Sequence, residues 1–323
     1  MEYEAQQLTA SGGDGTYSWS IDSGALPSGM AMTEAGEIGG TPRIPGDRDF
    51  TVEVTSGDGQ SARAEFSIPV DGSVILASLG AGGSHTCGIS TAGALYCWGR
   101  NFQGELGDGT ETSRNTPVLV GETLLPWSDV ESASLHTCGV AAFGEAYCWG
   151  DNTSGKLGDG SVSNSLVPTR VVGDLTFRMV SASSADFTCG VTVDDDAYCW
   201  GRNDHGALGD GTTEFRMVPT AVTGGLEFVM ITTGGGQACG VTVASEGYCW
   251  GFNGVGQVGN GTQTTDPITT PQPVSGGLAY RDISGGDSHT CAVTTEGAGY
   301  CWGSNRWGEL GDGSVTRSST PVA

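Results

Sequence analysis

The chain has 323 residues, of which 56 are glycine, and its 37 acidic residues outweigh 13 lysines and arginines to give a net charge of −24. A nucleic-acid-binding protein usually carries a basic face, and a membrane-spanning helix needs roughly 18 consecutive apolar residues. The sequence offers neither, so we expect no nucleic-acid partner and no membrane insertion. Abundant glycine and few helix formers indicate short strands joined by tight turns, an all-β chain.

The first 71 residues lack cysteine, and residues 50–54 and 64–68 alternate apolar and polar side chains as strands do. With residues 26–29 (LPSG) and 39–42 (GGTP), they resemble the immunoglobulin-like (cadherin-like) module of bacterial surface proteins. The resemblance implies a small β-sandwich that serves as a spacer or adhesion unit. Because the match starts inside the module's first strand, we expect that strand to be truncated and its sheet edge to be open to another chain.

Residues 72–323 carry a repeat marked by five pairs of cysteines, each pair with nine intervening residues. The first members recur at intervals of 51, 51, 50 and 52 residues, a period typical of propellers and solenoids. Each second cysteine is followed by Trp-Gly, an Asn, and a Leu-Gly-Asp-Gly-Thr/Ser turn in which Val258 and Asn260 are the variants.

The phrases "GGSHTCGIS", "ALYCWGRNFQGELGDGT" and "TPVLV", echoed five times, resemble the RCC1-like repeat in the cysteine-bearing form common in secreted bacterial proteins. The resemblance implies a β-propeller in which each unit of about 51 residues is one blade. The better-known members have seven blades. Five repeats therefore predict a closed five-bladed ring or an open arc that another subunit completes.

The cysteines of a pair lie symmetrically about a short loop, residues 142–144 in the second unit. Antiparallel pairing of the flanks puts Gly144 at the left-handed third loop position, where Asp195 is a tolerated substitute and Ser245 fits less well. The two cysteines then face each other within disulfide reach, with metal binding and reduced packing cysteines as alternatives. The predicted disulfides are Cys87–Cys97, Cys138–Cys148, Cys189–Cys199, Cys239–Cys249 and Cys291–Cys301.

The tryptophan after each second cysteine projects to the opposite face of its sheet, and we expect it to pack against the adjoining blade. Stacking on a ligand is the alternative. The five residues are Trp98, Trp149, Trp200, Trp250 and Trp302.

Three histidines, His85, His136 and His289, come shortly before a first cysteine, and we expect them to bond to neighbouring backbone. Convergence near a propeller axis as metal ligands is the alternative. The Gly-Asp-Gly segments are expected to be turns, with calcium sites as the alternative. The sequence has no G-x-S-x-G or H-E-x-x-H motif, so we expect no enzymatic activity, no cofactor and no metal.

Regularly spaced cysteines in even number are typical of exported proteins, although the first residues are no signal peptide, so we expect a segment of a longer chain. The sequence predicts an extracellular or cell-surface, non-enzymatic scaffold that binds a protein or glycan. One alternative is a structural subunit of an extracellular filament or surface layer that self-associates through strand edges. Another is a secreted enzyme or an enzyme inhibitor.

Overall fold

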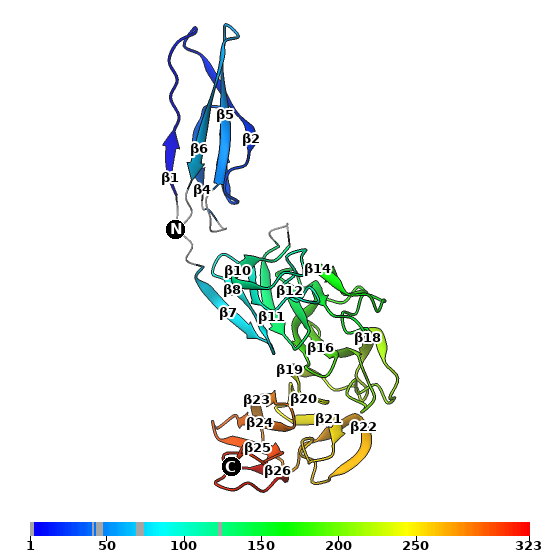
Figure 1. Ribbon diagram of the computed structural model, residues 1–323. Coiled ribbons are helices and arrows are strands. Elements are labelled where there is room, and N and C mark those ends of the chain that lie inside the picture. Colours follow the sequence, from blue (N-terminus) through cyan, green and yellow to red (C-terminus); the bar gives the residue numbers. More distant parts are fainter. Residues whose placement is uncertain (1–2, 41, 43–47, 69–73, 122–124) are drawn as a thin grey trace. The chain divides into compact units, whose positions relative to one another are not determined.

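The computed structural model describes residues 3–40, 42, 48–68, 74–121 and 125–323, and it confirms the all-β prediction (Figure 1). These residues form no helix, and hence none with the length and apolar character to span a membrane. Contacts divide the chain into two compact units, Met1–Ile75 and Leu76–Ala323. The boundary expected between residues 71 and 72 lies outside the described residues.

The first unit consists of two three-stranded antiparallel sheets. In sheet order the strands are β1 (Tyr3–Gln7), β4 (Glu37–Gly40) and β3 (Met30–Met32), and β2 (Tyr17–Gly24), β5 (Arg48–Ser56) and β6 (Ser61–Ile68). Apolar side chains from both sheets, Ile38 on β4 and Phe50, Val52 and Ile68 on β5 and β6, form the core. The strand expected to be truncated is β1, which has five residues and pairs with β4 at the edge of its sheet.

The second unit is a row of five four-stranded antiparallel sheets, which we call blades 1 to 5 (Figure 1). Blade 1 has β7 (Leu76–Ala81), β8 (His85–Ser90), β9 (Leu95–Gly99) and β10 (Arg114–Leu119); blade 2 has β11 (Trp127–Ser132), β12 (His136–Ala141), β13 (Ala146–Gly150) and β14 (Ser165–Arg170). Blade 3 has β15 (Phe177–Ala182), β16 (Phe187–Thr192), β17 (Ala197–Gly201) and β18 (Arg216–Ala221). Blade 4 has β19 (Phe228–Thr233), β20 (Gln237–Thr242), β21 (Gly247–Asn253) and β22 (Thr264–Pro273); blade 5 has β23 (Tyr280–Gly285), β24 (His289–Thr294), β25 (Gly299–Gly303) and β26 (Ser318–Val322).

The hairpin between the second and third strands of each blade has the geometry that the sequence predicts. Cys138 lies directly opposite Cys148, and the third loop residue, Gly144, has a φ of 91°. The same position is left-handed in every blade, including Asp195 (φ 69°) and Ser245 (φ 62°). Ser245 therefore adopts a left-handed backbone conformation that is strained for serine and that glycine would adopt more readily.

The hydrophobic cores of the second unit lie between blades, and we call each such contact a seam. The first strands of successive blades (β7, β11, β15, β19 and β23) are neighbours in that order. At the seam between blades 2 and 3, the Cys138–Cys148 pair and Leu157 of blade 2 meet Phe177 and Trp200 of blade 3. The other three seams repeat this composition. Blades 2 to 4 thus each bury one face against the blade before and the other against the blade after.

The row of blades is an open arc, because blades 1 and 5 each have one uncovered face. Leu79 of blade 1 is 62% exposed, whereas its equivalents Val130, Val180 and Ile231 in blades 2 to 4 are at most 5% exposed. At the other end, no described atom lies within 4 Å of the Cβ position of Gly311. Of the two architectures that five repeats predict, the structure has the open one.

Candidate interaction face

The tryptophans of blades 2 to 5 lie in the seams and are fully buried. The indole Nε1 of Trp149 donates to the backbone oxygen of Glu105 in blade 1 at 2.9 Å, and Trp200 donates to that of Lys156 in blade 2 at 2.9 Å. Trp250 and Trp302 make the same bond to Ala207 and Gln257 at 2.8 and 2.9 Å. Trp98 differs in being only partly buried, because no described blade precedes blade 1.

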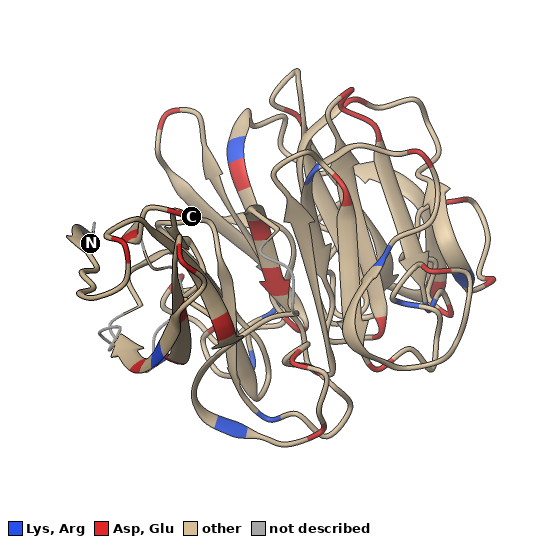
Figure 2. Ribbon diagram, turned by 90° about the horizontal axis from the view of Figure 1, so that it is seen from above, with Lys and Arg blue, Asp and Glu red and all other residues tan. Residues whose placement is uncertain are grey.

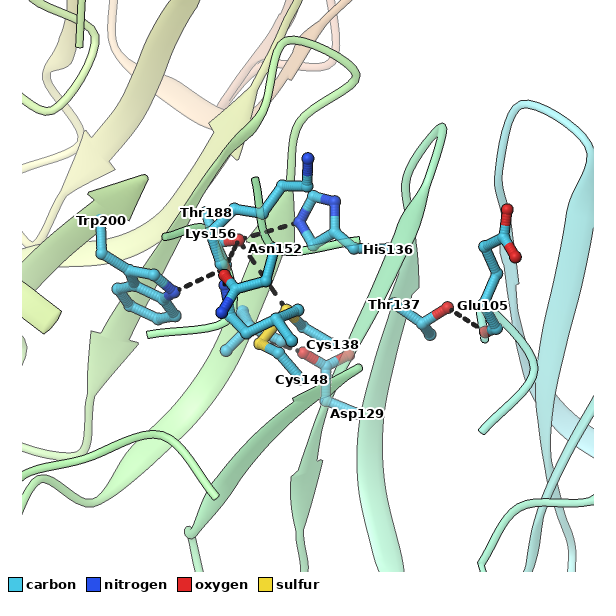
Figure 3. Close-up of a disulfide and its surroundings, with 12 residues drawn as sticks. Glu105, Asp129, His136, Thr137, Cys138, Cys148, Asn152, Lys156, Thr188 and Trp200 are labelled. Atoms are coloured by element: carbon cyan, nitrogen blue, oxygen red, sulfur yellow. Dashed lines mark hydrogen bonds between the residues drawn. A yellow bond between two sulfur atoms is a disulfide. The ribbon is translucent and has the colours of Figure 1, made fainter. Parts of the chain in front are cut away.

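A disulfide joins each cysteine pair named from the sequence. Figure 3 shows the one between Cys138 and Cys148. The sulfurs face the seams, so the bridges of blades 1 to 4 are completely buried. Both cysteines of blade 5, Cys291 and Cys301, are partly exposed, since their seam face is uncovered. The disulfides are thus part of the inter-blade core as well as staples within one hairpin.

His85 and His136 bond across the seams and not to their neighbouring backbone, so the expectation is wrong for these two histidines. His85 Nε2 lies 2.7 Å from Thr137 Oγ1 of the next blade, and His136 Nε2 lies 3.0 Å from Thr188 Oγ1 (Figure 3). Burial, together with the charge of Arg100, lowers the pKa of His85 to about 4, and burial is the main cause that lowers the pKa of His136. Both rings are therefore neutral at physiological pH.

The seam between blades 2 and 3 contains a buried ion cluster that sequence reasoning missed. The ammonium of Lys156 is fully buried and contacts Asp151 of its own blade and, at 2.6 Å, Asp186 of blade 3. Two features of the sequence could have indicated this cluster. Lys156 is the single lysine of the chain, and it occupies the position that Ala207 and Gln257 occupy in other repeats. The cluster adds a charged link to the apolar contacts and hydrogen bonds of this seam.

Two carboxyl groups on β11 also escaped sequence reasoning. Asp129 Oδ2 accepts a hydrogen bond from the backbone nitrogen of Val180 in blade 3 at 3.0 Å. Burial, and then the charge of Asp129, raises the pKa of Glu131 to about 7. Burial likewise raises the pKa of Asp129. The sequence did contain a signal: when the repeats are aligned, Glu131 is a charged residue at the position where blades 3 and 4 have the uncharged Ser181 and Thr232.

The Gly-Asp-Gly segments are hydrogen-bonded turns. Asp108 Oδ1 accepts from the backbone nitrogen of Thr110 at 3.0 Å, from its hydroxyl at 2.7 Å, and from Asn101 Nδ2 at 3.1 Å. Asn203 and Asp210 repeat the amide–carboxylate contact at 3.2 Å. The carboxylate oxygens thus close the loop, which is the role expected for these segments.

The surface that remains for a partner includes a band that we call the hairpin rim, the loops between the second and third strands of the blades. Its members are tied to the next blade: the Gly144 oxygen accepts from Phe177 N at 2.8 Å, and the Asp195 oxygen accepts from Phe228 N at 2.7 Å. Equivalent bonds join blade 1 to blade 2 and blade 4 to blade 5. These four bonds hold the loops of blades 1 to 4 along one side of the blade row.

The hairpin rim combines exposed apolar side chains with acidic ones. Phe143, Val193 and Val243 are 77%, 54% and 49% exposed on three consecutive blades. The acidic residues of these loops are Glu145, Asp194, Asp195, Asp196, Glu246 and Glu296. Arg178, at the start of blade 3, binds Asp195 and so is engaged within the rim. Figure 2 shows the same imbalance over the chain, with many Asp and Glu and few Lys and Arg.

The first unit has a cavity of about 320 Å³ lined by Trp19, Val52, Val54 and Phe66, with Leu8 at its border. Its lining is mainly the inner face of the β2–β5–β6 sheet. Loop residues such as Ser11 and Gln60 also line it, and we assign no ligand to it.

Comparison with protein families finds models described as "Regulator of chromosome condensation (RCC1) repeat" over residues 92–140, 144–191, 194–241 and 247–293, and a second model of that description over 77–105, 180–207 and 280–308. A model described as "Putative Ig domain" matches residues 2–71.

Two curated relatives share about a third of the aligned residues. The Ultraviolet-B receptor UVR8 of Arabidopsis thaliana is 32% identical over 259 residues, which is 78% of this chain and 58% of UVR8. The E3 ubiquitin-protein ligase HERC2 of Homo sapiens is 30% identical over 256 residues, which is 76% of this chain and 5% of HERC2. The chain therefore spans little more than half of one relative and a small part of the other.

Solved structures share the fold. Human WBSCR16 matches with a TM-score of 0.70 and 18% identity, covering 86% of this chain and 79% of that one. Yeast RCC1 (Prp20), in its complex with Kap60, matches with a TM-score of 0.67 and 14% identity, covering 84% and 72%. At these identities the likeness concerns the fold alone.

Proposed function

Because the chain belongs to the RCC1 repeat family and carries an immunoglobulin-like domain at its N-terminus, we propose that it is a non-enzymatic binding and scaffolding protein of the cell exterior or cell surface. Its relatives support a protein-interaction propeller: the yeast structure is of RCC1 bound to the protein Kap60. HERC2 is named a ligase, but the chain aligns with only 5% of it, so that activity gives no support for an enzyme here.

The exterior location is proposed from the five disulfides, because such bonds persist in oxidising compartments and are rare in the cytosol. Four of them are buried in seams between blades. A reducing compartment would leave those cysteines as thiols in the cores that hold the blades together.

The observation that carries the binding proposal is the hairpin rim. Exposed apolar side chains at its centre, such as Phe143, resemble the contact residues of protein interfaces, where aromatic side chains contribute most. The surrounding carboxylates favour a partner with basic residues, which they attract and orient. We therefore propose that the partner is a protein segment with both apolar and basic side chains. A glycan is the competing ligand.

The test compares two triple variants with the parent chain on arrays of synthetic peptides and of glycans. The rim variant is Phe143→Ser/Val193→Ser/Val243→Ser, and the control Phe102→Ser/Phe215→Ser/Val315→Ser changes three other exposed apolar residues, which lie outside the rim. Basic, apolar peptides should bind the parent and the control but not the rim variant, and less tightly as salt rises. Glycan binding alone, or equal peptide binding by all three proteins, would contradict the proposal.

A further inference from the structure

The residue just before the buried Leu or Val of each turn differs in charge from blade to blade. At this position the five blades have Glu105, Lys156, Ala207, Gln257 and Glu309. Glu105, Lys156 and Gln257 are 0% exposed, so in three of the four seams a polar side chain fills the space between the blades. Ala207 has no polar group in its side chain, which ends at Cβ. The seam between blades 3 and 4 therefore lacks the side chain that fills the others.

That seam contains a cavity of about 90 Å³, which is more room than one water molecule needs. In the seam between blades 2 and 3, the ammonium of Lys156 contacts Asp186 at 2.6 Å. Ala207 replaces Lys156 and Gly236 replaces Asp186 in the next seam, so both of these side chains are missing there. The lining of the cavity includes Arg202, His205, Ala207 and Gly236.

Blade 1 shows which group fits beside an arginine at this place. Arg100 corresponds to Arg202 in the repeat, and its Nε lies 3.5 Å from Glu105 Oε1. The other carboxylate oxygen of Glu105 accepts from the backbone nitrogen of Gln103 at 2.8 Å. The seam between blades 1 and 2 thus holds a buried carboxylate between a guanidinium and a backbone N–H group.

Blade 3 has the same two donors without the carboxylate. Arg202 takes the place of Arg100, and His205 takes the place of Gln103. The loop has the same fold, because Leu208 N donates to the side-chain oxygen of Asn203 at 3.0 Å, and the equivalent bond in blade 1 is 2.9 Å. Within the described part of the chain, the backbone nitrogen of His205 has no acceptor. This N–H group is therefore available to a ligand in the cavity.

Arg202 is engaged on one side only. Its Nε donates to Asp204 Oδ2 at 2.6 Å, and the two side chains are 50% and 56% exposed. A guanidinium has five N–H groups, and no described residue accepts from the two terminal nitrogens of Arg202. Asp204 thus competes for the charge of Arg202 but leaves most of its donors free.

We propose that the cavity between blades 3 and 4 binds a carboxylate group, which takes the place that Glu105 takes between blades 1 and 2. One oxygen accepts from the guanidinium of Arg202 and the other from His205 N, as charge-assisted hydrogen bonds. The carboxylate belongs to a small free acid or to an acidic side chain of a partner. Because the net charge of −24 repels anions from most of the surface, binding depends on these two local donors.

This site is separate from the hairpin rim and goes beyond the function proposed for it. Arg202 directly follows the end of β17, and Gly236 directly precedes the start of β20. The hairpin rim lies at the other ends of these two strands. A carboxylate can therefore occupy the cavity whether or not a basic segment occupies the rim.

The experiment titrates the whole ¹⁵N-labelled chain with two probes and follows the amide signal of His205 and the Nε signal of Arg202 by NMR. The probes are sodium acetate, exchanged for sodium chloride at constant ionic strength, and the capped peptide acetyl-Ala-Glu-Ala-amide. Two charge-assisted hydrogen bonds at an open site predict a dissociation constant on the order of 1–10 mM. The spectrum also shows whether each variant is folded.

Four variants separate the site from general electrostatics. Arg202→Gln removes the guanidinium and should weaken binding by about tenfold or more. Arg306→Gln is the matched control, because it removes the same charge from an exposed residue in the corresponding loop of blade 5. Asp204→Asn removes the competing carboxylate and should strengthen binding by up to about fivefold, as expected for a weak exposed ion pair. Ala207→Glu supplies the carboxylate of blade 1 from within the chain and should abolish binding.

The parent and Arg306→Gln should show the same saturable downfield shift of the His205 amide proton. Acetate binding without peptide binding identifies a free acid as the ligand, and tighter binding of the peptide identifies an acidic side chain; both support a carboxylate site. A parent whose His205 signal does not respond overturns the proposal. So does an equal response in Arg202→Gln, and so does a response that Ala207→Glu retains.

Discussion

The indole of Trp200 and the backbone carbonyl of Lys156, 44 residues apart in sequence, are joined by a hydrogen bond of 2.9 Å between two blades. The same carbonyl accepts from Thr188, so one oxygen is the meeting point of two donors from the next repeat (Figure 3). Because each seam contains this arrangement or a close variant of it, stability is expected to depend on contacts between repeats more than within them.

Truncation of a seam tryptophan should destabilise the chain strongly. Trp200→Ala removes a fully buried side chain and should lower the free energy of unfolding by about 3–5 kcal/mol. Trp98→Ala provides the matched control, because Trp98 lies on an uncovered face. Urea denaturation measures the free energy of unfolding of both variants. Equal losses of stability would mean that burial in a seam is not the reason why Trp200 stabilises the fold.

The glycine beneath each seam indole should tolerate no side chain. Gly158 and Gly211 have φ of 70° and 83°, so alanine at either position costs roughly 1–2 kcal/mol of backbone strain. Gly158→Ala additionally places a methyl group 2.7 Å from Trp200 Nε1, whereas nothing lies within 4 Å of the Gly211 position among described atoms. Thermal unfolding should therefore show Gly158→Ala as clearly the less stable, by a further ~1–3 kcal/mol. Similar melting temperatures would contradict the packing argument.

The buried lysine should be needed only while its acidic partners are charged. Lys156→Ala leaves Asp151 and Asp186 without their cation, and loss of one partner of a buried ion pair typically costs about 3–5 kcal/mol. The triple variant Lys156→Ala/Asp151→Asn/Asp186→Asn should recover much of that loss, since the equivalent position in blade 3 is the neutral Ala207. Denaturant titration compares the three proteins. No recovery in the triple variant would indicate that the lysine contributes by packing alone.

Glu131 should make the chain less stable as pH rises. Its folded pKa of about 7 lies above the ordinary value of 4.5, so the folded state holds a proton that the unfolded state releases. The associated stability is fully present below pH 4.5 and is lost as pH rises to about 7. Glu131→Gln should match the parent near pH 4 and exceed it at pH 8, as measured by urea titration at both values. An advantage that is the same at both pH values would contradict the raised pKa.

The disulfide of blade 5 should be the first to open under reductant. Cys291 and Cys301 are partly exposed, whereas the eight other cysteines are 0% exposed. Brief treatment of native protein with a limiting thiol, followed by alkylation and peptide mass spectrometry, should label these two first. Uniform labelling of all ten cysteines would show that opening of the whole fold controls access.

Much of the fold was predictable because the structure of each repeat depends mainly on residues that are close together in the sequence. The symmetric spacing about residues 142–144 was enough to predict the hairpin, the opposed cysteines and the left-handed third position. Turn chemistry and strand period are local properties that neighbouring residues determine. The tryptophans were also placed between blades, which the structure shows for four of the five.

Many of the features that sequence reasoning missed are contacts between residues of different repeats. The partner of His85 is Thr137, 52 residues away, and one of the two partners of Lys156 is Asp186, 30 residues away. The choice between an open arc and a closed ring depends on the rotation between blades, which no single repeat encodes. Side-chain contacts across a seam depend on how two blades pack in three dimensions, and the order of residues within a repeat does not show which side chains will meet.

Each disulfide closes a loop within one repeat, with a sequence separation of 10 residues. A gene that gains or loses one whole repeat therefore gains or loses both cysteines of a bridge, and no thiol is left to pair wrongly. The indole and its carbonyl acceptor likewise recur once per repeat, so a newly joined pair of repeats already has a complementary contact. This modular chemistry permits arrays of different length to arise by recombination without a redesign of their bonding.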